Sequence, residues 1–414
     1  LVEYIFNGES IMALTPISEA TPPGMTKGAA PWQSGHAVWQ LGFRPLYLLA
    51  AVFAAIAIPL WLASYLGWLP GGARLGLGWH MHEMVFGFAV AVVVGFLYTA
   101  GRNWTGLPTP HGAPLMALAG LWLAGRVAMA CFPGAAAALV DWLFLPLATY
   151  PLYRVLRRSG NTRNLFLVGL LALLALANGL YHAGALGALA LPPMLPVQAA
   201  IFIIVLIESV IGARVIPMFT RNGAPGSAPA ASPKRALAAV ACMAAAAIAW
   251  LAGAPGALTA PLAFCAAGVS LANLLAWQPQ RTLRVPLLWI LHLSYAWIGI
   301  GFALLAAASL HLLPASAAFH ALTVGSMAGL IIGMMTRTTL GHTGRALKGG
   351  RAEAAMYWLI QLGALARLLA AVGPAALAMP ALLAAGLCWT LAFVLYAVVY
   401  APYLWRARVD GREG

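Results

Sequence analysis

The sequence predicts an all-α, polytopic integral membrane protein with about twelve transmembrane helices and with both termini in the cytoplasm. Three observations lead to this fold class. Hydrophobic residues make up 63% of the 414 residues and charged residues only 8%, whereas soluble domains are roughly 25% charged. Apolar stretches of about 20 residues, the length that crosses a bilayer, recur along the chain. The basic residues lie almost entirely in alternate connections between those stretches.

Twelve stretches are long and apolar enough to be spans, and Gly and Pro mark most of the gaps between them. They cover about 45–68, 80–101, 113–132, 138–156, 164–186, 195–217, 235–253, 257–277, 285–309, 317–340, 353–373 and 380–405. We predict one twelve-helix domain over residues 41–408. A flexible lead-in over 1–40, rich in Pro, Gly, Ser and Thr, precedes it, and a short cytoplasmic tail over 409–414 follows.

The basic residues predict the orientation. Of the 23 Lys and Arg residues, all but Arg74, Arg126 and Arg367 flank connections on one side of the predicted membrane. Arg74 lies on the other side, and Arg126 and Arg367 fall inside spans. Cytoplasmic loops carry the excess of Lys and Arg, so both termini are expected in the cytoplasm. Because the net charge of +14 is spread thinly between apolar segments, we expect the lipid bilayer, and no nucleic acid, as the partner.

The cysteines argue against several kinds of site. Cys131, Cys242, Cys265 and Cys388 are scattered and form no CxxC pair, so disulfides, zinc ribbons and iron–sulfur clusters are not expected. The CxxCH signature of covalent haem attachment is also absent from the sequence. Any haem in this protein is therefore expected to be b-type.

Six of the nine histidines lie in apolar spans or at their edges: His80, His82, His182, His292, His320 and His342. The hydrocarbon interior penalises polar side chains by roughly 1–3 kcal/mol or more unless they find partners. Imidazole is also the commonest side-chain metal ligand and a usual axial ligand of haem iron. We interpret these histidines as a buried cofactor site. Four of them are predicted near the non-cytoplasmic face, with His292 deeper and His342 on the cytoplasmic side.

The densest polar cluster of any span is His80-Met81-His82-Glu83. On a regular helix His80 and Glu83 share a face, whereas His82 points roughly 160° away. The two histidines are therefore not expected to bind one ion together. Glu83 is a candidate to orient His80 or to relay protons. The alternative is a pair of interfacial histidines bound by lipid headgroups and water.

The other intramembrane histidines also have structural alternatives. Asn178 and His182 form one polar stripe by their spacing, which also suits a helix–helix hydrogen bond. His292 is a metal-ligand candidate or a neutral imidazole bonded to a carbonyl. His320 precedes a face of small residues, which allows close approach of a helix or of a flat macrocycle.

Two further polar groups are candidates. Glu208 lies within a span, where an ionisable group suggests a proton path, with a structural ion pair to Arg214 as the alternative. Arg337, His342 and Arg345 form a second polar patch on the predicted cytoplasmic side. That patch suits a cofactor, or a loop anchored to lipid phosphates.

Several motifs resemble the NnrS family, and the similarity covers residues from about 40 to 405. The matching segments are WHMHEMVFG at 79–87, NWTG at 103–106, IGARVIPMFTRN at 211–222, the run from 320 to GHTGR at 341–345, FRP at 43–45 and LHL at 291–293. The resemblance implies a multi-pass protein of the bacterial inner membrane that binds haem and copper. It also implies a role in denitrification and in relief of nitric oxide stress, with the six intramembrane histidines as candidate ligands.

Two functions follow from these expectations. The first is a haem-dependent oxidoreductase that binds nitric oxide and reduces it, with Glu83 and Glu208 as proton-relay candidates and with an unknown electron donor. The alternative is a non-enzymatic carrier, exporter or sensor of haem or copper. His111 and His311 lie in predicted loops, where water satisfies them, and are expected to tolerate substitution.

Overall fold

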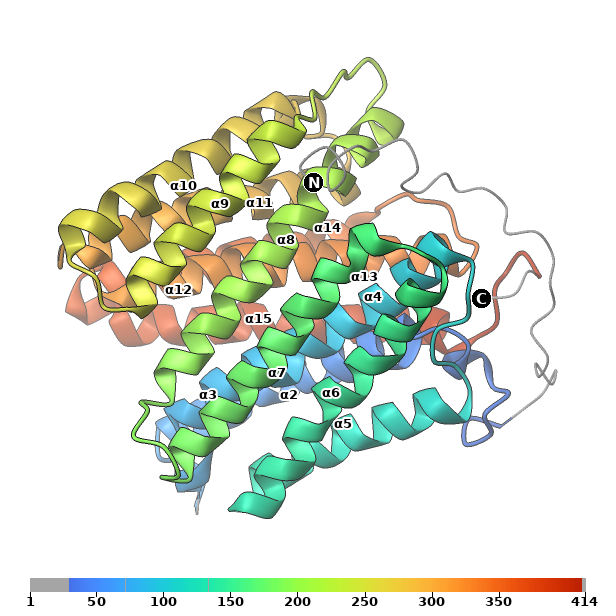
Figure 1. The fold of residues 1–414 in the computed structure, drawn as a ribbon, viewed down its shortest axis with the longest axis horizontal. Coiled ribbons are helices and arrows are strands. Elements are labelled where there is room, and N and C mark those ends of the chain that lie inside the picture. Colours follow the sequence, from blue (N-terminus) through green and yellow to red (C-terminus); the bar gives the residue numbers. More distant parts are fainter. Residues whose placement is uncertain (1–29, 71, 133, 412–414) are drawn as a thin grey trace. The chain divides into compact units, whose positions relative to one another are not determined.

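The computed structural model describes residues 30–70, 72–132 and 134–411, and it confirms the all-α polytopic fold (Figure 1). Twelve helices in this part of the chain are long and apolar enough to cross a membrane. The described residues include no strand. Of the predicted lead-in, residues 1–29 lie outside the described residues. The cytoplasmic placement of both termini stays a prediction.

The twelve spans match the predicted stretches in number and order. They are α2 (Phe43–Tyr65), α3–η3–α4 (Leu77–His82, Glu83–Ala89, Val90–Thr105), α5 (Ala113–Cys131), α6 (Ala135–Arg158), α7 (Leu165–Ala185), α8 (Met194–Gly223), α9 (Pro233–Leu251), α10 (Gly256–Ala276), α11 (Pro286–Ser309), α12–η6–α13 (Ala315–His320, Ala321–Ala328, Gly329–His342), α14 (Arg351–Val372) and α15 (Ala375–Trp405).

Glycine ends many of these helices. In a Schellman motif the first residue past the helix cap is left-handed, a conformation that glycine adopts without a Cβ clash. Five helices end in this way, with paired backbone hydrogen bonds back into the last turn, at Gly67, Gly160, Gly187, Gly253 and Gly344. These glycines, which mark gaps between the predicted spans in the sequence, therefore end helices in a defined backbone conformation.

The chain divides into two compact units, which are described separately. The first unit contains α2 to α7 together with residues 335–347 and 393–411. In it α5 packs against α6, α6 against α7, and α2 against α4. Arg44, fully buried at the start of α2, donates to the carbonyls of Leu404 (3.0 Å) and Arg406 (2.7 Å). These bonds supply partners to carbonyls at the end of α15, which the helix itself leaves without them.

The second unit contains residues 198–334 and 348–392. Here α10 packs against α9 and α11, α11 packs against α12 and η6, and α14 packs against η6. Trp297 and Ala321 form a buried apolar cluster with Ala364. The Trp297 indole also donates to Gln361 Oε1 at 2.7 Å, so a polar contact ties α11 to α14 within this apolar layer.

Two spans carry a π-helical segment that begins immediately after a histidine. His82 precedes η3, and His320 precedes η6. Glycines follow at matching spacings, Gly87 and Gly95 in the first case and Gly325 and Gly333 in the second. π-Helical segments recur at functional sites because they alter the facing of side chains and strain the backbone ladder. His80 and His82 still lie on regular α-helix, and the regular helical period is lost only from Glu83 onward.

Three spans are the most buried of the twelve. The central windows of Leu77–Thr105, Met194–Gly223 and Ala315–His342 are 89%, 78% and 78% buried, against 28–67% for the other nine. These three spans carry Glu83, Glu208 and His320. Three of the polar groups singled out in the sequence thus lie on the spans that face protein most completely.

Candidate metal and ion-pair site

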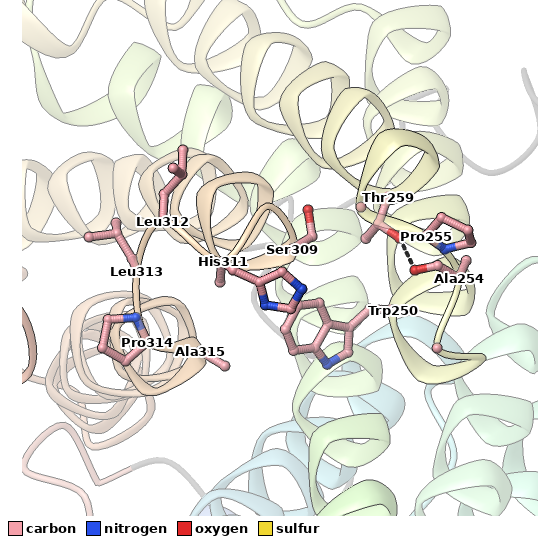
Figure 2. A pocket seen from close by; sticks show the side chains of 13 residues that line it. Trp250, Ala254, Pro255, Thr259, Ser309, His311, Leu312, Leu313, Pro314 and Ala315 are labelled. Atoms are coloured by element: carbon pink, nitrogen blue, oxygen red, sulfur yellow. Dashed lines mark hydrogen bonds between the residues drawn. The ribbon is translucent and has the colours of Figure 1, made fainter.

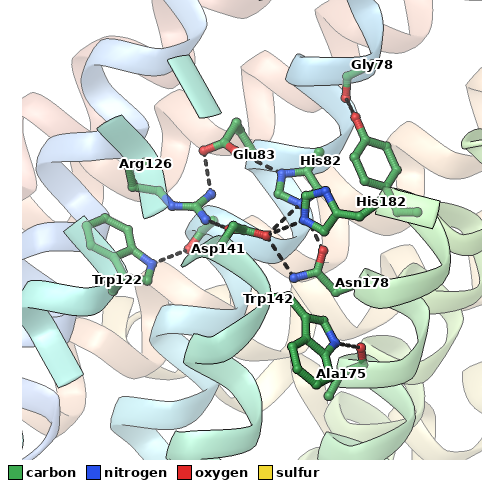
Figure 3. Close-up of polar contacts among 12 residues, drawn as sticks. Gly78, His82, Glu83, Trp122, Arg126, Asp141, Trp142, Ala175, Asn178 and His182 are labelled. Atoms are coloured by element: carbon green, nitrogen blue, oxygen red, sulfur yellow. Dashed lines mark hydrogen bonds and ion pairs between the residues drawn. The ribbon is translucent and has the colours of Figure 1, made fainter. Parts of the chain in front are cut away.

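A cluster of polar side chains lies in the first unit, where four neighbouring spans meet (Figure 3). Its six members come from α3, η3, α5, α6 and α7, and none is more than 7% exposed: His82, Glu83, Arg126, Asp141, Asn178 and His182. Burying this many polar groups in a membrane protein costs free energy unless each one finds a partner. The cluster meets that condition because its members bond to one another.

Asp141 is the centre of the cluster. Its Oδ2 lies 2.8 Å from His182 Nε2 and 3.1 Å from His82 Nε2, and it accepts from Asn178 Nδ2 at 2.9 Å. Its Oδ1 accepts from the guanidinium of Arg126. The carboxylate therefore joins α3, α5 and α7 through side chains alone.

The second carboxylate, Glu83, completes the network on the far side of His82. Glu83 Oε1 lies 2.9 Å from His82 Nδ1, and Oε2 accepts from Arg126. The sequence made Glu83 a candidate to orient His80 or to relay protons; in the structure its carboxylate bonds to His82 and Arg126. Arg126, which comes from another helix, holds the carboxylate on the His82 side.

The local fold makes room for Arg126. A Cβ at Gly87 would lie only 2.5 Å from Arg126 Nη1 and 3.0 Å from Glu83 Oε2. Trp122, on the same helix as Arg126, donates its indole N–H to the Gly87 carbonyl at 3.0 Å. The glycine at this point of η3 thus lets the guanidinium reach both carboxylates.

The charges and hydrogen bonds of the cluster favour a bound cation. Two carboxylates face one guanidinium, so the cluster carries one excess negative charge when both imidazoles are neutral. Both ring nitrogens of His82 face oxygen acceptors. A neutral imidazole donates through only one nitrogen, so a second proton or a metal ion is needed to satisfy the other.

The geometry also suits a metal ion. One ligand atom each from His82, Asp141 and His182 lie within 4.8 Å of one another, and all three residues are buried. Ligand atoms about 2.0 Å from a tetrahedral ion are separated by about 3.3 Å. The present separations from Asp141 Oδ2, 2.8 and 3.1 Å, would therefore widen by a few tenths of an ångström around an ion. Two imidazoles and one carboxylate would leave a coordination position for a small ligand.

The same residues do not fit haem. Both histidine Nε2 atoms point at one carboxylate oxygen, within 3.1 Å of it. A porphyrin plane on either nitrogen would have to occupy the space that Asp141 fills. The cluster is therefore suited to a metal ion, and a haem would need other ligands.

The remaining candidates of the first unit lie apart from this cluster's hydrogen bonds. His80 stacks on Trp61, with ring centroids 4.1 Å apart, on another side of α3 from His82. The His342 ring packs 5.8 Å from Phe43, and its carbonyl accepts from Arg408. The Arg345 guanidinium lies 3.9 Å from the Tyr403 ring centroid.

Arg337 is half-buried on α13, between the π-helical segment of that span and His342. The structure shows no bond from these three basic side chains to the His82 cluster. The predicted cytoplasmic patch is thus a separate feature of the first unit.

The second unit holds the other two histidines. His292 Nδ1 lies 3.1 Å from the Leu288 carbonyl, and its Nε2 lies 3.2 Å from Thr220 Oγ1. Both nitrogens are thus engaged, as in the structural alternative for this residue. His320 Nδ1 lies 2.7 Å from the Ser316 carbonyl. In metal-ligating histidines one ring nitrogen commonly bonds to a carbonyl in this way, which fixes the orientation of the ring.

Glu208 and Arg214 both lie on α8. Glu208 Oε2 accepts from Ser326 Oγ of η6 at 3.1 Å, and Oε1 is buried without a hydrogen-bond partner among the described residues. Arg214 is half-buried. The contact with Ser326 connects Glu208 to the span that carries His320.

Sequence reasoning missed two members of the cluster, Asp141 and Arg126. Both were visible as ionisable residues within predicted spans, which is the signal that drew attention to Glu208. Neither had a neighbouring histidine in the sequence, and their partners come from other helices. His82, Glu83, Asn178 and His182 were all named as candidates, and the structure brings these four together.

Comparison with known families gives one match, which covers most of the chain. The family model described as NnrS protein matches residues 37–408, nearly the whole chain. A search of curated proteins found no match. The matched region includes all twelve spans and every residue of the cluster. The chain therefore belongs to the NnrS family.

Proposed function

We propose that this protein binds a metal ion and haem b within the membrane, and that it binds and reduces nitric oxide to relieve nitrosative stress. Membership of the NnrS family suggests a role in the nitric oxide response. The observation that carries the proposal is the buried His82–Asp141–His182 arrangement. We further propose the bacterial inner membrane as its location.

Copper is the first candidate for the ion. Imidazole and carboxylate ligands suit copper, iron, zinc and nickel, and copper(II) binds such sites most tightly among the divalent ions of this series. Arg126 neutralises one of the two carboxylates. The remaining carboxylate charge would therefore neutralise half of the charge of a bound divalent ion, which lowers the cost of placing the ion in a buried site.

Nitric oxide matches this environment. It is small, uncharged and soluble in the bilayer, so it reaches a buried metal without an aqueous channel. The open coordination position left by three protein ligands would accept it. A dry site also strengthens electrostatic interactions with charge that develops on a bound ligand.

Haem, when bound, would supply redox-active iron for nitric oxide chemistry. His80, in the first unit, and His320, in the second, are proposed as separate candidate ligands. The Nδ1 contact of His320 with Ser316 orients the His320 ring. The His80 ring stacks on Trp61, which provides a flat aromatic surface beside it. His342 is a further candidate. Arg337 lies on the same span and Arg345 shortly after it, and arginines suit haem propionates.

Glu208 is the proposed proton relay. Reduction of two nitric oxide molecules to nitrous oxide and water consumes two protons and two electrons. Glu208 lies on α8, hydrogen-bonded to Ser326, with one oxygen unpartnered among the described residues. Glu83 has the same chemistry but is held by Arg126 and His82, which favours a structural role for it.

Purified protein in detergent tests the proposal. Haem is measured by pyridine haemochrome, metals by elemental analysis, and nitric oxide consumption with ascorbate and a redox mediator as donor. The proposal expects haem b, about one additional metal ion per chain and donor-dependent consumption. Bound cofactors without consumption would favour the carrier or sensor alternative, and absence of both cofactors would contradict the proposal.

A further inference from the structure

A pocket of about 850 Å³ lies at one end of the second unit, and none of the proposed metal ligands, haem ligands or proton-relay residues lines it (Figure 2). It is formed where α9 ends, α10 begins, α11 ends and α12 begins. These are the ends of four membrane spans, so the pocket lies at the level of a bilayer surface. Its volume is within the range of about 300–1,000 Å³ that small-molecule sites show.

His311, at the rim, has an unusual backbone. It follows α11 with φ of 59°, and its N–H bonds to the Ala308 carbonyl while that of Leu312 bonds to Ala307. This is a Schellman motif with histidine in the left-handed position. The five such helix ends described above all place glycine there. Non-glycine residues are uncommon in this conformation, and histidine is among those that adopt it most often, so the surroundings of the side chain decide whether it has a role.

Gln278 is the other non-glycine residue with positive φ in the described part of the chain, and its side chain differs from that of His311. Its side chain has a structural use, because its Oε1 accepts from the Ala228 N–H at 2.9 Å. The exposed imidazole of His311 makes no hydrogen bond to any described residue, and in Figure 2 it lies in the pocket beside Trp250.

Trp250 provides a fixed flat surface in the pocket. Its indole N–H donates to Gln198 Oε1 at 3.0 Å, and Phe319 packs edge-on at 5.9 Å. A Cβ at Gly256, which also lines the pocket, would clash with the Ser309 carbonyl, so α10 and α11 approach closely there. Helix α10 has no side-chain cap and begins at Gly256, whose amide is a backbone donor at the pocket wall, whereas the amides of Leu258 and Thr259 bond to the Pro255 carbonyl.

The lining indicates the chemistry of a ligand. It contains no Lys, Arg, Asp or Glu, so it offers nothing to a phosphate or another charged headgroup. It does offer an aromatic platform, an imidazole and a backbone donor. Around it Leu258, Leu310 and Leu312 are 53%, 47% and 70% exposed. A neutral ring with oxygen substituents and an apolar tail matches each of these features.

We propose that this pocket binds the ring of a membrane quinol, the tail running along the exposed leucines. In this role the ring stacks on Trp250, and one ring oxygen bonds to His311, which exchanges a proton readily near neutral pH. The donor role rests on the proposed function. One quinol becomes quinone and supplies the two electrons and two protons that convert two nitric oxide molecules to nitrous oxide and water. This assigns His311 a use that its place in a predicted loop did not suggest.

The test measures quinone binding directly, without nitric oxide. The full-length protein in detergent is titrated with decylubiquinone by calorimetry. His311→Gly keeps the left-handed backbone and removes the imidazole, so it should weaken binding at least about tenfold without lowering the melting temperature. Trp250→Leu should weaken binding similarly. Gln278→Gly is the matched control and should leave binding unchanged.

The outcomes separate the two proposals. No saturable binding, wild-type affinity in His311→Gly, or displacement of the quinone by phospholipid vesicles but not by a second quinone overturns the quinone site. Decylubiquinol failing to support nitric oxide consumption that an artificial donor does support overturns its role as donor. Failure with both donors contradicts the proposed function, while the calorimetric result still decides the site.

Discussion

Asp141 and His182 meet between α6 and α7, with 2.8 Å between Oδ2 and Nε2. The residues are both buried, and the same Oδ2 atom also lies close to His82 and Asn178. One carboxylate thus brings together ligands from three helices that are separate in the sequence.

Asp141→Asn is expected to lower the metal affinity by at least tenfold. The substitution keeps the size of the side chain but removes the anionic ligand and the charge that compensates a cation. Metal content after dialysis against a chelator measures the effect. Asp410→Asn is the control, because Asp410 pairs with Arg408 in an exposed position and is not near the cluster. Equal metal content in both variants would contradict the assignment of Asp141 as a ligand.

Arg126→Met is expected to destabilise the protein more than any ligand substitution. It leaves the carboxylates of Glu83 and Asp141 buried without their cation, and breaking a buried ion pair in this way costs about 3–5 kcal/mol. Thermal unfolding in detergent measures the change. Arg74→Met, which removes an exposed bond to the Cys131 carbonyl, is the comparison and should have little effect. Similar melting temperatures would show that Arg126 has no such role.

Gly87→Ala is expected to displace Arg126 and reduce metal binding. The added Cβ would lie 2.5 Å from Arg126 Nη1, too close for any side-chain contact. Gly120→Ala provides the control, because a Cβ there has no neighbour within 4 Å and alanine favours helix. Metal content and melting temperature are measured for both. The packing argument fails if the Gly87 variant retains wild-type values.

His320→Ala and His292→Ala are expected to differ in haem content. His320 is a proposed haem ligand, so its loss should remove haem or change the visible spectrum. Both nitrogens of His292 are engaged by Leu288 and Thr220, so its replacement should retain haem and lower stability by about 1–3 kcal/mol. Pyridine haemochrome and oxidised and reduced spectra compare them. Retention of normal haem by the His320 variant would exclude it as a ligand.

Glu208→Gln is expected to retain haem and metal but to slow nitric oxide consumption. Glutamine preserves the hydrogen bond with Ser326 yet cannot relay a proton. Consumption is measured with an artificial donor, alongside cofactor content. Full activity in this variant would mean that Glu208 serves the packing of α8 against η6 and carries no protons.

The sequence predicted the twelve spans well because apolar length is a local property, which a helix of known rise converts directly into a membrane crossing. It also identified His82 and His182 as ligand candidates at the same depth in the membrane. It did not identify Asp141 or Arg126, because their roles depend on contacts between helices. The pairing of Glu83 with His82 was missed for the same reason. His82 and Glu83 are adjacent in the sequence, and it is Arg126, from another helix, that holds the Glu83 carboxylate on the His82 side.

The most direct measurement of the central claim is X-ray absorption at the copper edge of purified protein loaded with copper. The proposed site predicts two imidazole nitrogens and one carboxylate oxygen around the ion, and a change in this signature in both His82→Ala and His182→Ala. Nitric oxide added to the reduced protein should alter the spectrum by binding at the open position. A spectrum unchanged in both histidine variants, or copper that does not bind at all, would contradict the account.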